Sequence, residues 1–151
     1  MRFSRLALVL LAFAVASMAA DPFVGTWKLN SAKTKYKTGM PPKDQTVTFT
    51  EEGTDLHAMV KGSSSDGQAI SVHFTVPTAG GTGKIIESPY DGVSAKRPSP
   101  NERDTSFSKG GKVVYTAKAK RSSDGKTITV SVKGTNPSGQ MVDGTNFYDK
   151  Q

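Results

Sequence analysis

The feature that most constrains the fold is a period-two alternation of apolar and polar residues that runs through almost the whole chain. Short turn signals such as Asp124-Gly125 interrupt it, and this combination is typical of half-buried β-strands. No segment has a helical apolar face, and two prolines limit any helix in the long connection 31–43 to a turn or so. The pattern predicts ten strands, at residues 23–29, 45–50, 54–62, 68–77, 84–87, 92–96, 104–109, 112–121, 126–134 and 140–150.

Consecutive strands joined by tight turns, with no crossover helix, form an antiparallel meander. Such a sheet must bury its apolar face and protect its edges, and no helices are predicted that could cover it. Closure into a barrel does both. We therefore expect an all-β fold in which an antiparallel meander of eight to ten strands closes into a β-barrel.

Loop lengths predict the register, because a slip by one residue would exchange the two faces of a strand. Loops 122–125, 135–139 and 63–67 predict three pairings that keep apolar residues together on the inner face: Ala119 with Ile128, Val132 with Val142, and Ala58 with Val72. The same registers direct Gly144, Asn146 and Tyr148 inward. They also set His57 opposite His73 on the outer face.

The N-terminal residues have the three parts of a secretory signal: a basic start, an apolar run over residues 6–15 and a small-residue exit. Cleavage after Ala19 places Ser17 and Ala19 at the two positions that need small side chains. We expect a signal peptide at 1–19, one barrel domain at 20–151, and a periplasmic or secreted protein. The apolar run is too short to span a bilayer, so we expect no membrane insertion.

The composition narrows the possible chemistry and partners. The chain has no cysteine, which excludes disulfides and thiol chemistry. The formal net charge of +7 falls to +5 without Arg2 and Arg5. A positive charge can attract nucleic acid or an anionic surface, but these lysines are scattered without interleaved aromatic residues. We favour a lysine-rich solvated surface and expect no nucleic-acid partner.

No group of residues predicts catalysis. The chain has two histidines, His57 and His73, and no third histidine or cysteine to complete a closed zinc site. A loose Zn²⁺ or Cu²⁺ contact at this pair is an alternative to two solvated imidazoles. The serines have no base on the inner face, and no Gly-x-Ser-x-Gly segment occurs. We expect no enzymatic activity, no metal site and no cofactor.

The segment Asp21-Pro22-Phe23-Val24-Gly25-Thr26-Trp27-Lys28-Leu29-Asn30 resembles the opening strand of the calycins. It is similar both to the Gly-x-Trp of lipocalins and to the Phe-Val-Gly-Thr-Trp-Lys-Leu of fatty-acid-binding proteins. The ending, 133–150, resembles the closing strands of the fatty-acid-binding branch. The resemblance implies a bacterial lipocalin-like β-barrel over the whole mature chain, with Trp27 plugging one end.

The departures from this family change the expected ligand. Fatty-acid-binding proteins hold the ligand carboxylate with an Arg-x-Tyr that aligns with 146–148, where Tyr148 is kept and Asn146 replaces the arginine. A second family arginine aligns near Ala119, and 31–43 is too short for the family's two-helix lid. Without a guanidinium, a buried carboxylate would be costly. We therefore expect a small, mainly apolar, uncharged ligand, with five binding residues: Asn146, Tyr148, Tyr115, Phe74 and Val130.

A second hypothesis is a barrel with a solid core that has no small-molecule ligand. It would act as an envelope or extracellular protein-interaction module. Outward apolar side chains, with Met59, Met141 and Phe147 as the first candidates, would then have to form one patch.

Overall fold

The computed structural model describes residues 19–151, so the predicted signal segment up to residue 18 lies outside the described residues. Twelve strands are present: β1 (Gly25–Leu29), β2 (Lys35–Thr38), β3 (Asp44–Glu52), β4 (Asp55–Ser63), β5 (Ala69–Pro77), β6 (Gly81–Thr82), β7 (Lys84–Glu87), β8 (Gly92–Ser99), β9 (Glu102–Lys109), β10 (Lys112–Arg121), β11 (Thr127–Thr135) and β12 (Met141–Lys150).

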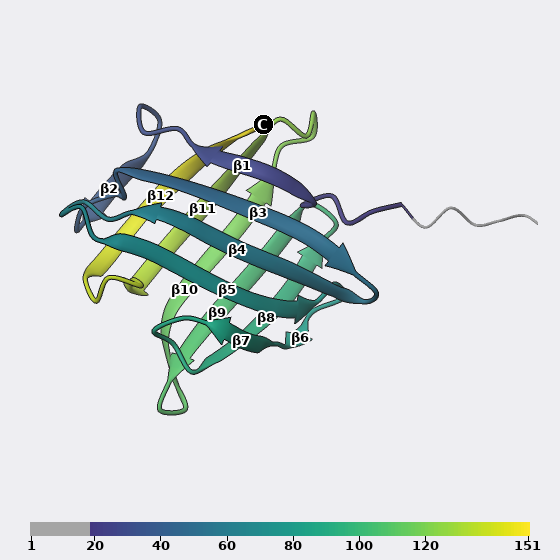
Figure 1. Cartoon of the computed structure of the whole chain (residues 1–151). Coiled ribbons are helices and arrows are strands. Elements are labelled where there is room, and N and C mark those ends of the chain that lie inside the picture. The colour runs from purple at the N-terminus through teal and green to yellow at the C-terminus, as the bar shows by residue number, and fades with distance from the viewer. Residues whose placement is uncertain (1–18) are drawn as a thin grey trace, which may run out of the picture.

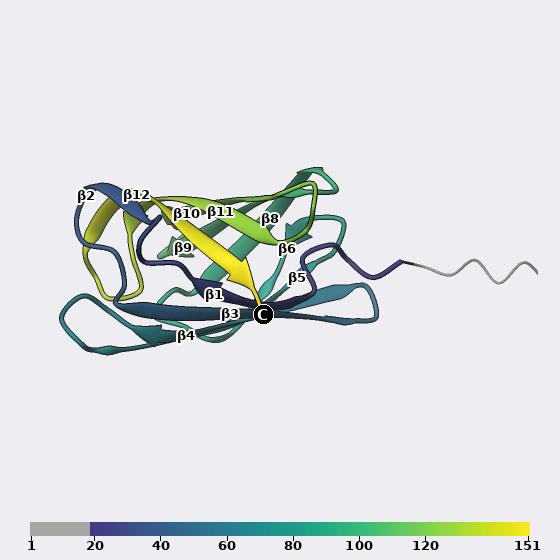
Figure 2. The same cartoon turned by 90° about the horizontal axis from the view of Figure 1, so that it is seen from above.

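These strands form one antiparallel sheet in the order β6-β8-β9-β10-β11-β12-β1-β3-β4-β5-β7, with β2 paired to β12. Figures 1 and 2 show two layers, β1, β3, β4 and β5 in one and β8 to β12 in the other, whose strands cross at a large angle. The strands at the two ends of this order, β6 and β7, are separated in the chain by Gly83 alone. The sheet is therefore a nearly closed barrel, with residues 81–87 as the seam between β8 and β5.

The all-β fold and the antiparallel meander agree with the prediction, and each of the ten predicted strands has a counterpart. The prediction of eight to ten strands was wrong, because β2 and β6 are additional. Both are too short to show an alternation, since β2 reads Lys-Tyr-Lys-Thr and β6 has two residues. β2 lies in the connection 31–43 and pairs with the first half of β12, while β1 pairs with its last residues.

The predicted registers of the three hairpins were wrong by two residues. The structure pairs Ala119 with Val130, Val132 with Gly144, and Ala58 with Phe74. Each turn is centred one residue later than predicted. In each turn a polar side chain accepts from a backbone N–H on the far side: Ser64 Oγ from Gln68 (3.1 Å), Ser122 Oγ from Thr127 (3.1 Å) and Asn136 Oδ1 from Gln140 (2.9 Å).

A register error of two residues leaves every side chain on its predicted face. Odd-numbered residues of β1 and even-numbered residues of β12 therefore point inward, as predicted. Trp27 and Phe23 are fully buried, and the Trp27 indole Nε1–H donates to the Phe23 carbonyl at 2.9 Å. Both residues belong to the hydrophobic core, which also includes inward side chains of β4, β5 and β9.

Candidate ligand-binding cavity

The barrel contains a partly open cavity of about 120 Å³ between its two layers. Its wall is built mainly from aliphatic and aromatic side chains of β1, β3, β4, β5 and β9 to β12. Three small or β-branched positions, Ala117, Ala119 and Val130, leave the space open on the β10–β11 side. The interior is therefore not filled solid by side chains.

The five predicted binding residues, Asn146, Tyr148, Tyr115, Phe74 and Val130, all lie on the wall of this cavity. They come from four strands, and alternation places them there. Trp27 lies on the same wall. The structure thus brings the predicted residues together, while ligand binding by them stays a prediction.

A polar strip crosses the mainly apolar wall from β12 to β3. The Asn146 side-chain amide Nδ2 donates to the Tyr148 hydroxyl at 3.4 Å, and this hydroxyl donates to Gln45 Oε1. Asn146 is 3% exposed. Its carbonyl oxygen, Oδ1, accepts no hydrogen bond from any residue between 19 and 151.

Three of the four tyrosines, Tyr90, Tyr115 and Tyr148, line the cavity, and Tyr36 lies on β2. Tyr90 stacks on Tyr115, with ring centroids 5.8 Å apart and planes within 7°, and its hydroxyl donates to the Thr135 carbonyl at 2.6 Å. Tyr36 of β2 packs against Gly144, where a Cβ would lie 2.2 Å from the ring carbon Cδ1. Burial raises the pKa of Tyr36, Tyr90, Tyr115 and Tyr148 above the usual 10.0.

Because each of these pKa values is raised in the folded state, the unfolded chain loses phenolic protons at a lower pH than the folded chain does. We therefore expect tyrosine ionisation to leave the free energy of unfolding unchanged below pH 10.0 and to lower it above that pH. Denaturant unfolding followed against pH, together with phenolate absorbance, measures this. Titration of tyrosines near pH 10 in a protein that remains folded would contradict it.

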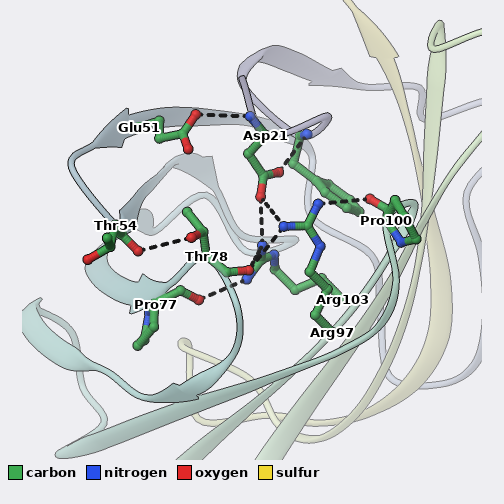
Figure 3. A network of polar contacts seen from close by, with 9 residues as sticks. Asp21, Glu51, Thr54, Pro77, Thr78, Arg97, Pro100 and Arg103 are labelled. Atoms are coloured by element: carbon green, nitrogen blue, oxygen red, sulfur yellow. Dashed lines mark hydrogen bonds and ion pairs between the residues drawn. The ribbon is translucent and has the colours of Figure 1, made fainter. Parts of the chain in front are cut away.

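A buried ionic cluster occupies the end of the barrel where β5 ends and β9 begins (Figure 3). The carboxylate oxygen Asp21 Oδ2 lies 2.9 Å from Arg97 Nη1 and 3.0 Å from Arg103 Nη2. The side chains of Asp21 and Arg103 are 1% and 3% exposed. The same two guanidinium nitrogens also donate to the Thr78 carbonyl, and Asp21 Oδ1 accepts from the Phe23 amide.

This cluster corrects the expectation of an interior without a guanidinium, because Arg103 lies on the cavity wall. Burial lowers the pKa of Arg103, and Asp21 opposes this effect. The sequence prediction missed Arg103 because the predicted strand began at residue 104. Extending the alternation Phe107, Thr105 by one step would have placed residue 103 inward, but its partner Asp21 is 82 residues away.

The two histidines do not lie directly opposite each other, because the register of β4 and β5 is shifted. His57 pairs with Thr75 and His73 with Met59, and the imidazole centroids are 6.1 Å apart. His57 Nε2 lies 3.2 Å from Glu52 Oε2. Within residues 19–151, no group of three or more His, Cys, Asp and Glu side chains is arranged to hold a metal ion.

Of the outward apolar residues singled out from the sequence, Met59 and Met141 are exposed, and Phe147 is half-buried. No helix in the described part of the chain has the length and apolarity needed to cross a membrane.

No protein-family model matches the chain, and no curated protein matches it. Two designed proteins are among the solved structures that resemble it. One is a redesigned β-barrel, mFAP1, bound to DFHBI, with 13% identity and a TM-score of 0.48 over 89% of this chain and 100% of that one. The other is a de novo designed fluorescence-activating β-barrel, with 18% identity and a TM-score of 0.45 over 87% and 96% of the two chains. We therefore base the function on the chain's own cavity.

Proposed function

We propose that this chain is an exported, non-enzymatic, lipocalin-like barrel that binds one small, mainly apolar, uncharged molecule in its central cavity. The observation that carries the proposal is the cavity of about 120 Å³, with a mainly apolar wall and a few polar groups, among them the strip from Asn146 to Gln45. Binding sites for small molecules have this composition, in which apolar surface supplies affinity and a few polar groups fix orientation. The predicted signal sequence supports export.

The volume of the cavity sets the size of the ligand. An apolar cavity of about 150 Å³ accommodates benzene, whereas pockets for drug-sized molecules span about 300–1,000 Å³. At about 120 Å³, this cavity is smaller than one that holds benzene, so the ligand can be no larger than a single small ring unless the wall adjusts. A long-chain fatty acid is too large, which agrees with the loss of the family's carboxylate-binding arginine on β12.

The state of Arg103 favours an uncharged ligand. Both of its terminal nitrogens already donate to the protein, Nη2 to Asp21 and to the Thr78 carbonyl, and Nη1 to the Pro77 carbonyl at 3.5 Å. A ligand carboxylate would have to compete for this guanidinium with Asp21, which pairs with both Arg97 and Arg103, although Arg103 Nε has no partner among residues 19–151. The desolvation of a second carboxylate would then be poorly compensated.

A substitution that places a larger side chain in the cavity tests this proposal. Ala119 lies on the cavity wall, while Lys118, its neighbour on β10, is exposed. We expect Ala119→Phe to weaken binding of benzene or pyrrole by about tenfold or more, because the new ring occupies the ligand's space. Lys118→Phe, which adds the same ring outside the barrel, should bind like the wild type.

Calorimetry and NMR shifts of the cavity-lining residues measure this binding. Failure of both probes to shift the cavity residues of the wild-type protein would contradict the proposal. Equal binding by the two variants would place the site elsewhere. The alternative, an interaction module without a small-molecule ligand, predicts that neither probe shifts the cavity residues.

A further inference from the structure

Two histidines and a methionine lie side by side on the outer face of β4 and β5. His57 and Met59 are two residues apart on β4, so both point outward, and Met59 pairs with His73 of β5. His73 is therefore the direct neighbour of Met59 and the diagonal neighbour of His57. Directly paired side chains on one face of a sheet have Cβ atoms about 4.5–5.5 Å apart. The three side chains thus form one cluster.

This cluster is open to solvent, so an ion can enter it without any opening of the barrel. The His57 side chain is 27% exposed, Met59 is 39% exposed and His73 is half-buried. The residues paired with these three, or one step further across the sheet, are Thr48, Thr50, Thr75, Glu87 and Lys84.

The separation of the two imidazoles matches that of two ligands of one metal ion. A metal ion lies about 2.0–2.1 Å from a ligating imidazole nitrogen, which places it about 3 Å from the ring centroid. Two imidazoles that share an ion therefore have centroids about 5–6 Å apart, with the larger value for a nearly linear arrangement. The centroids of His57 and His73 are 6.1 Å apart. This pair can share an ion without movement of the strands.

Two carboxylates and a lysine flank the cluster. Glu52 Oε2 lies 3.2 Å from His57 Nε2, and Glu87 pairs with His73 across β5 and β7. Lys61 Nζ lies 3.8 Å from Glu87 Oε2 and offsets that charge. In the part of the chain that the structure describes, neither glutamate completes a group of three His, Cys, Asp or Glu ligands. The fixed nitrogen ligands are therefore the two imidazoles.

We propose that His57, Met59 and His73 form a surface binding site for a copper ion. A closed zinc site needs four ligands, which this cluster does not supply. Divalent ions at such sites bind in an order that favours Cu²⁺ over Zn²⁺, and a thioether ligand selects Cu⁺. The imidazoles bind either oxidation state, and the Met59 sulfur binds Cu⁺. The predicted register concealed this site, because it set the two histidines directly opposite each other and so placed Met59 elsewhere.

Titration of the untagged protein with copper at neutral pH tests the site. Cu²⁺ and Zn²⁺ binding are measured by calorimetry, and Cu⁺ binding is measured without oxygen in competition with the chelator bicinchoninate. NMR follows the imidazole signals and the Met59 methyl signal. The variants are His57→Gln, His73→Gln and Met59→Leu. Lys61→Gln is the matched control, because it places the same glutamine on the outer face of β4 and removes no proposed ligand.

We expect the wild type to bind one Cu²⁺ about tenfold or more tightly than Zn²⁺, with broadening of both imidazole signals. Each His→Gln variant should weaken binding of Cu²⁺ and Cu⁺ by about tenfold or more. Met59→Leu should weaken Cu⁺ binding alone, and Lys61→Gln should bind at least as tightly as the wild type.

Three results would overturn the inference. Zn²⁺ binding as tight as Cu²⁺ binding would contradict the choice of copper. Cu²⁺ binding that survives both His→Gln substitutions would place the ion elsewhere. Unchanged Cu⁺ binding by Met59→Leu would contradict the three-ligand site.

Discussion

Asp21→Ala is expected to lower the free energy of unfolding by about 3–5 kcal/mol, because it leaves two arginines at the end of the barrel without their carboxylate. Arg103 is the more costly of the two, since its side chain is 3% exposed against 22% for Arg97. The variant also removes the acceptor of the Phe23 amide. Denaturant unfolding at neutral pH measures the loss.

Two further variants identify the cause. Glu51→Ala removes a carboxylate of the same network that is exposed and accepts only from the Asp21 backbone amide at 2.9 Å, and it should cost less than about 1 kcal/mol. Adding Arg103→Met to Asp21→Ala removes the most buried unpaired charge, and this double variant should regain part of the lost stability. An Asp21→Ala protein as stable as Glu51→Ala would show that the two arginines do not depend on the Asp21 carboxylate.

Gly83→Ala is expected to open the seam of the barrel. A Cβ at residue 83 would lie 2.1 Å from the Thr75 carbonyl oxygen and 2.7 Å from Val76 Cγ1. The carbonyl belongs to the backbone of β5 and cannot turn away without breaking the pairing of β5 with β7. We expect a loss of roughly 1–3 kcal/mol. We also expect faster hydrogen exchange at the Gly83 amide, which donates to the Val93 carbonyl at 2.9 Å.

The matched control is Gly92→Ala, at the start of β8. A Cβ there would meet only the Ser108 side chain, at 3.4 Å, which is ordinary contact. This variant should remain within about 0.5 kcal/mol of the wild type. Equal stabilities of the two alanine variants would mean that the chain at residue 83 can move away from β5 without cost.

The sequence predicted the cavity wall better than it predicted the pairing of strands. Whether Phe74 or Asn146 faces inward depends only on period-two alternation, and an error of two residues in register does not change the answer. The pairing depends on which residues form each turn. Serine and asparagine side chains in these turns accept hydrogen bonds from the backbone, as Ser64 does from Gln68 at 3.1 Å.

Other features could not be read from local pattern at all. β6 has two residues and is recognised as a strand because it pairs with β8. The ionic cluster joins Asp21 to Arg103, and nothing near either residue in the sequence indicates the other. The volume left by Ala117, Ala119 and Val130 depends on how far apart the two layers stand, which is a property of the closed barrel.

The pairing of the last strand with the first two affects how the protein can be made. β12 supplies the hydrogen-bonding partners of β11 on one side and of β1 and β2 on the other. During synthesis, both neighbours are already present while Met141–Lys150 is still in the ribosome. The wall between the two halves of the chain can therefore be assembled only after β12 has emerged from the ribosome, so the barrel cannot close around its core before that point.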